Sequence, residues 1–112
     1  MERERFIRVP KDAKAMEDYD CGVQKNDQIE EMILTEQQYK ILNDMELFDK
    51  INDKCDVIID DFEEEVIELD KIPLALEVVV QLSKNNSSAE LLEVKKMFEL
   101  ALNFKTIIGF DF

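Results

Sequence analysis

The spacing of apolar residues changes along this chain between a strand-like and a helix-like period, and this mixture limits its possible folds. Three segments show strand-like patterns: 5–10, 29–34 and 106–112. In segments 36–54 and 88–104, apolar residues recur every three or four positions, as on an amphipathic helix. A chain of 112 residues holds one hydrophobic core. We therefore predict a single small α+β domain over residues 1–112, with two layers: about three helices packed on a small, mostly antiparallel sheet.

Local signals place the helix starts. Thr35 and Gln38 have the spacing of a capping box and predict a helix over 36–54. Pro73 suits the first turn of a helix that continues to Leu82. A second capping box, Ser87 with Glu90, predicts the start of the last helix, over about 88–104.

Residues 56–69 fit two different structures. Their apolar side chains continue the helical rhythm of the preceding segment, yet alternation at 65–69 and the β-branched content fit a strand. We favour a break near Asp56 and a strand within 62–69, because an uncapped helix much longer than about 25 residues is unusual in a small domain.

The remaining segments give weaker patterns. The strand at 5–10 ends at a proline, as an edge strand does. Residues 11–27 are polar and predict a loop with one short helical turn around 13–16. Gly109 indicates a bulge or a close approach of another group to the backbone. Five aromatic rings are predicted to centre the core: Phe48, Phe62, Phe98, Phe104 and Phe110.

The net charge of −13 is concentrated in the middle of the chain. Residues 1–14 carry five basic and three acidic side chains, residues 15–70 carry four and nineteen, and residues 71–112 carry five of each. Such a field repels nucleic acid and anionic membranes, and it attracts basic proteins or divalent cations. We expect no nucleic-acid partner and no membrane partner.

The residue inventory argues against catalysis. The chain has no histidine, which is the commonest general base and zinc ligand, and only two glycines, too few for a phosphate-binding loop. Cys21 and Cys55 are expected to be reduced thiols, because no export signal or membrane span is visible and a cytoplasmic location is expected. We predict a protein that is not an enzyme and needs no cofactor.

A run of carboxylates is the feature that most suggests a function. We predict that these residues bind a partner: Asp53, Asp56, Asp60, Asp61, Glu63, Glu64 and Glu65. On a continuous helix, several of these carboxylates would share one face and could hold Ca²⁺ or Mg²⁺. The EF-hand spacing with its central glycine is absent, so no metal site is predicted. Tyr19 is a candidate interface anchor, although such a tyrosine often only covers the edge of the core.

These observations favour a non-enzymatic, acidic protein-interaction domain that binds or neutralises a basic partner. Bacterial immunity proteins and DNA-mimic inhibitors share this composition, and the analogy rests on composition alone, because no family motif is present. Two alternatives stay open: a structural or oligomerising domain, in which homo-oligomers form, and a weak binder of divalent cations through the central carboxylates.

Overall fold

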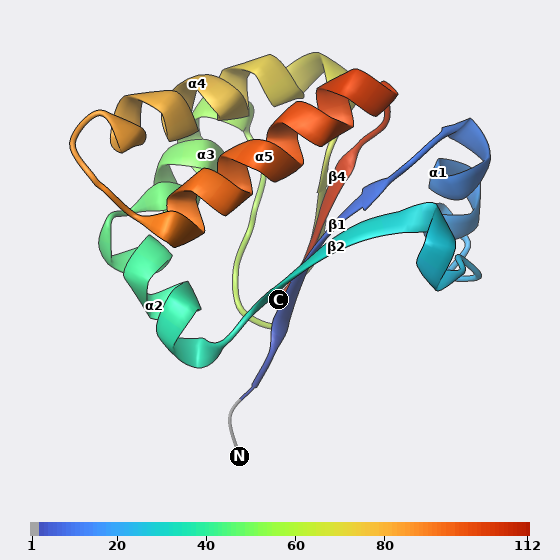
Figure 1. Ribbon diagram of the computed structural model, residues 1–112, viewed down its shortest axis with the longest axis horizontal. Helices are drawn as coiled ribbons and strands as arrows, with labels where there is room; N and C mark the ends of the chain where they lie inside the picture. The colour runs from blue at the N-terminus through green and yellow to red at the C-terminus, as the bar shows by residue number, and fades with distance from the viewer. Residues whose placement is uncertain (1–2) are drawn as a thin grey trace.

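A four-stranded antiparallel sheet forms the frame of the protein in the computed structural model, which describes residues 3–112. The strand order is β2-β1-β4-β3, and Figure 1 shows β1 and β4 in the middle of the molecule. The strands are β1 (Arg5–Pro10), β2 (Ile29–Leu34), β3 (Glu64–Ile67) and β4 (Ile108–Asp111). The predicted strands are confirmed, including the one predicted within 62–69.

Five α-helices accompany the sheet within residues 3–112, so the predicted number of about three was too low. They are α1 (Ala13–Asp20), α2 (Glu36–Asp44), α3 (Leu47–Cys55), α4 (Ile72–Ser83) and α5 (Ala89–Phe104). Two short 3-10 turns, η1 (Asn26–Gln28) and η2 (Leu69–Lys71), precede β2 and α4. The α+β class is confirmed, and the two-layer packing stays a prediction.

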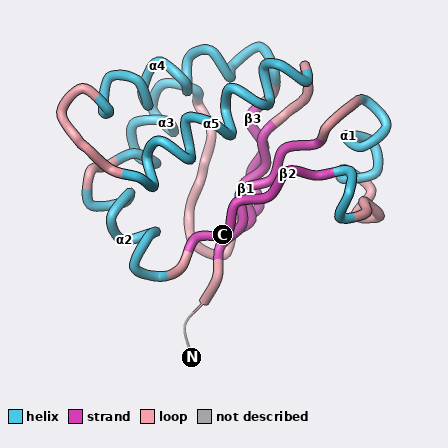
Figure 2. The backbone as a smooth tube through the Cα atoms, viewed as in Figure 1, coloured by secondary structure: helices cyan, strands magenta, loops and turns pink. Residues whose placement is uncertain are grey.

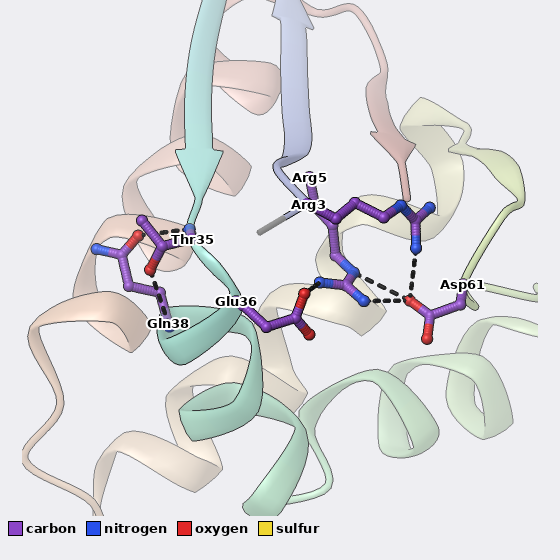
Figure 3. A network of polar contacts seen from close by, with 6 residues as sticks. All are labelled: Arg3, Arg5, Thr35, Glu36, Gln38 and Asp61. Atoms are coloured by element: carbon purple, nitrogen blue, oxygen red, sulfur yellow. Dashed lines mark hydrogen bonds and ion pairs between the residues drawn. The ribbon is translucent and has the colours of Figure 1, made fainter. Parts of the chain in front are cut away.

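The helix predicted over 36–54 is in fact two helices. Its start is as predicted: the Thr35 hydroxyl accepts from the Gln38 backbone amide at 3.2 Å, and the Thr35 amide donates to the Gln38 side chain at 2.9 Å (Figure 3). The break comes at Glu46, whose φ of 63° is left-handed and cannot continue a helix. No glycine or proline announces this break in the sequence.

Two other helix starts differ from the prediction. The short turn around 13–16 is the beginning of the full helix α1, because Asp12 caps it by accepting from the Ala15 amide at 2.7 Å. Helix α5 begins one residue later than its predicted capping box, and Ser88 rather than Ser87 accepts from the Leu91 amide at 3.2 Å.

Strand β1 lies inside the sheet, between β2 and β4, and the expectation of an edge strand was wrong. Pro10 occupies its last position, so the missing amide hydrogen falls at the end of the ladder. The Pro10 carbonyl accepts from the buried Thr106 hydroxyl at 2.6 Å. The proline therefore ends the strand without weakening its interior.

The core lies between the sheet and the helices α3, α4 and α5. Helix α5 contacts β1, β2 and β4, α4 packs on α5, and α3 packs on α4. Of the five rings predicted to centre the core, Phe98, Phe110 and Phe48 are buried and Phe104 is partly buried. Phe62 is 84% exposed, so its assignment to the core was wrong. It lies in the loop between α3 and β3.

Helix α1 stands on the other side of the strands from α3, α4 and α5 (Figure 2). Its Tyr19 side chain packs against β4 at Gly109. A Cβ atom added to Gly109 would lie 2.1 Å from the Tyr19 hydroxyl oxygen and 2.8 Å from the ring carbon Cζ. The expectation of a close approach at Gly109 is confirmed. Glycine at this position lets α1 pack against the sheet.

Replacing Gly109 with alanine should destabilise the fold. We expect Gly109→Ala to lower the free energy of unfolding by about 1–3 kcal/mol, because the added methyl group overlaps the Tyr19 ring. Urea denaturation measures this loss. In a Tyr19→Ala background the same substitution should cost much less, and an equal cost in both backgrounds would contradict the contact.

Candidate functional site

The seven carboxylates predicted to bind a partner do not form one helical face. Asp53 lies on α3, Asp56 ends that helix with a left-handed φ of 55°, and the others follow in the loop and in β3. The structure decides the ambiguity of residues 56–69 in favour of a loop and a strand, so the stacking expected on a continuous helix does not occur.

Asp61 is held by the protein's own arginines (Figure 3). One of its oxygens accepts from Arg5 Nη2 at 2.6 Å and Nε at 3.0 Å, and from Arg3 Nη1 at 3.2 Å. Arg5 is only 3% exposed; it also pairs with Glu36 at 3.1 Å and lies 3.6 Å from the centroid of the Tyr39 ring. Burial alone would lower the pKa of Arg5, but the hydrogen bonds to Asp61 and Glu36 outweigh it and raise the pKa.

Glu65 also serves the fold. One carboxylate oxygen accepts from the Ile58 amide at 2.8 Å and the other from the Val66 amide at 3.0 Å. Asp60 accepts from the neighbouring amide of Asp61 at 2.8 Å. These contacts join the loop to the outer edge of β3.

Four of the predicted residues remain exposed, and within residues 3–112 their carboxylates make no ion pair or hydrogen bond: Asp53, Asp56, Glu63 and Glu64. Only two of the seven, Glu64 and Glu65, line the acidic groove described below. The structure thus brings part of the predicted cluster together with acidic residues from elsewhere in the chain.

The strand register explains how this second group forms. Arg8 lies opposite Gly109, which lies opposite Val66. Two residues further along β4, Asp111 lies opposite Glu64. Residues directly opposite each other in antiparallel strands point to the same face of the sheet. In the row between them, Ile7 and Phe110 are buried in the core, so the side chains of Arg8, Asp111 and Glu64 occupy the face on which α1 stands.

An acidic groove of about 800 Å³ lies between α1 and this face of β3 and β4. Six acidic residues line it: Glu17, Asp20, Glu64, Glu65, Glu68 and Asp111. Arg8 is the single cationic residue among the described lining residues, and it already pairs with Asp111 and, at 2.8 Å, with Glu31. Burial alone would lower the pKa of Arg8, but these hydrogen bonds raise it. The groove therefore carries a surplus of negative charge.

Gln24 gives this groove an unmet hydrogen-bonding need. Its side-chain oxygen is buried, and it is the one buried side-chain polar atom without a partner in the described part of the chain. Gln24 lines the groove. A buried acceptor without a donor costs free energy, so this oxygen is an unpaired acceptor in the wall of the groove.

Tyr19, the predicted anchor, covers part of the groove and the sheet at once. Its hydroxyl donates to Asp111 at 3.4 Å, and burial, assisted by the Asp111 carboxylate, raises the pKa of Tyr19 well above its usual range. The ring is thus a neutral wall of an otherwise charged groove. Phe110 and Phe112, at the end of the chain, are buried in the core.

The complete groove was not predictable from the sequence, because its acidic residues come from α1, from β3 and the residue after it, and from β4. Glu17, Asp20, Glu68 and Asp111 were missed as site residues. The local signal that could have helped was Asp12, since a capped helix over the next eight residues would have placed Glu17 and Asp20 beside Tyr19.

Within residues 3–112, no three acidic, cysteine or histidine side chains are placed to hold a metal ion together. Both cysteines are free, as predicted; Cys55 is buried, and this burial raises the pKa of its thiol. None of the described helices is long and apolar enough to cross a bilayer.

Comparison with known proteins finds no matching family model, no similar curated sequence and no similar solved structure. The site is therefore interpreted from its own geometry.

The two tyrosines should resist titration while the protein is folded. Burial raises the pKa of Tyr19 and, to a lesser degree, of Tyr39. The folded state thus favours the neutral phenols, and their contribution to stability, complete below about pH 10, is lost as the pH rises through the folded-state pKa values. We expect phenolate absorbance to appear together with loss of the circular dichroism signal. A phenol that titrates near pH 10 in the folded protein would contradict this.

Arg5 should contribute more to stability than its neighbour Arg3. We expect Arg5→Met to lower the free energy of unfolding by about 2 kcal/mol, because it removes several charge-assisted hydrogen bonds at a buried position. Arg3→Met removes one partly exposed ion pair and should cost less than about 1 kcal/mol. Denaturant unfolding of both variants measures the difference, and equal losses would contradict the role given to Arg5.

Proposed function

We propose that this protein is a non-enzymatic, acidic interaction domain that binds a basic segment of a partner protein in the acidic groove. Binding there would block or regulate the partner, as an inhibitor or immunity protein does. The observation that carries the proposal is the charge imbalance of the groove: its lining holds six acidic residues and one arginine, and that arginine is already paired.

The groove suits a cationic, hydrogen-bonding ligand better than an apolar one. Sites for small organic ligands are lined mainly by apolar and aromatic side chains with few polar groups. Here charged side chains are half of the lining, and Gln24 adds an acceptor without a donor. Arginine and lysine side chains supply charge and N–H donors together.

The charge of the whole chain supports the same proposal. A net charge of −13 draws a basic protein toward this surface and speeds its association. Because exposed charges are screened over about 8 Å at physiological ionic strength, added salt should slow association more than it speeds dissociation.

A labelled oligo-arginine peptide tests the proposal directly. Fluorescence anisotropy should show saturable binding to the wild-type chain, and Glu64→Gln combined with Glu68→Gln should weaken it by about tenfold. The matched control, Glu93→Gln with Glu99→Gln, removes the same charge from α5, outside the groove, and should change the affinity by less than about twofold. Equal losses in the two double variants would contradict a binding site in the groove.

A further inference from the structure

Residues 56–63, here called the α3–β3 loop, are held firmly by the rest of the protein. The Asn52 side chain donates to the Ile59 carbonyl at 3.0 Å and accepts from the Ile59 amide at 2.8 Å. Ile59 itself is buried, and Asp61 is bound by Arg5 as described above. At the end of the loop, the Glu63 carbonyl accepts from the Phe112 amide at 3.1 Å.

This well-anchored loop leaves two large apolar side chains mostly exposed, and the Arg3 guanidinium covers part of one of them, 4.1 Å from the Phe62 ring centroid. Ile58 is 67% exposed and Phe62 is 84% exposed. Phe62 also has a φ of 65°, a left-handed conformation that glycine or asparagine adopts more readily than an aromatic residue. The fixed backbone means that a partner would meet both side chains already ordered, which is the condition under which apolar anchors bind best.

The α3–β3 loop leads directly into the acidic groove. Ile58 donates its amide to Glu65, and Phe62 precedes Glu64 by two residues, at most about 7 Å of chain. Glu64 lines the groove, and Glu65 lies next to it with its carboxylate bound to the Ile58 and Val66 amides. One partner segment can therefore contact the apolar side chains and the carboxylates together.

The charges around the loop select among possible occupants. Exposed carboxylates of Asp56, Asp60 and Glu63 flank the two apolar side chains. A second copy of this chain would bring the same carboxylates and the same net charge of −13, and an anionic membrane would be repelled in the same way. A surface that is both apolar and basic complements this one.

We propose that the partner segment is amphipathic: its arginine or lysine side chains enter the groove, and its apolar side chains pack on Ile58 and Phe62. This inference rests on the proposed function and specifies its partner. The two side chains are the apolar anchors of the interface, and the groove supplies the charge contacts.

Two peptides with identical arginines separate the apolar contribution from the ionic one. One peptide carries leucines between its arginines, and the other carries serines at those positions. We expect the wild-type chain to bind the leucine peptide about tenfold more tightly than the serine peptide, because the leucines cover apolar surface at Ile58 and Phe62. Anisotropy with both peptides gives this ratio.

A double variant, Phe62→Asn with Ile58→Ser, should bind the leucine and serine peptides with nearly equal affinity. It should still bind the serine peptide. Asparagine accepts the left-handed conformation at 62, so the fold is kept, and thermal unfolding verifies this. Leu92→Ser is the matched control: Leu92 is 59% exposed on α5, and its loss should leave the ratio unchanged.

The outcomes distinguish the two proposals. If the wild-type chain binds both peptides equally, or if the Phe62→Asn, Ile58→Ser variant keeps the tenfold ratio, the apolar anchors are refuted and the groove proposal stands. If neither peptide binds, the proposed function fails, and the anchor proposal fails with it.

Discussion

The position of the α3–β3 loop depends on the buried guanidinium of Arg5. A buried cation needs partners on all sides, and Arg5 finds them in Glu36 at the start of α2, in Asp61 of the α3–β3 loop and in the Tyr39 ring. Tyr39 in turn stacks on Phe48 with ring centroids 5.5 Å apart. Arg5 thereby fixes the start of β1, the start of α2 and the loop relative to the aromatic core.

Some carboxylates of the chain stabilise the fold and are not free to bind a partner. Asp61 and Glu65 stabilise the fold, and Glu65 does so by capping the Val66 amide at the outer edge of β3. An edge strand with free amides invites pairing with another strand, and a carboxylate placed on the edge discourages it. A partner is then expected to bind through side-chain contacts in the groove rather than by extending the sheet.

The parts of the fold that local signals control were predictable, and the parts that long-range packing controls were not. The Thr35 capping box and the strands at 29–34 and 108–111 follow from short patterns that the structure confirms. The break at Glu46 has no glycine or proline to announce it, and Phe62 was placed in the core because apolar character does not reveal which loop residues face outward.

The candidate site was predictable only in part for the same reason. Composition identified the acidic middle of the chain, and Glu64 and Glu65, which line the groove, were among the residues chosen. The groove itself arises because Gly109 lets Tyr19 pack on β4, which brings Glu17 and Asp20 beside the sheet.

The most direct test of binding in the groove is a nuclear magnetic resonance titration of isotope-labelled protein with an oligo-arginine peptide. The account predicts that amide shifts concentrate at residues 17–24 and 64–68; shifts of equal size at the exposed carboxylates of α5, or no shifts at all, would contradict it.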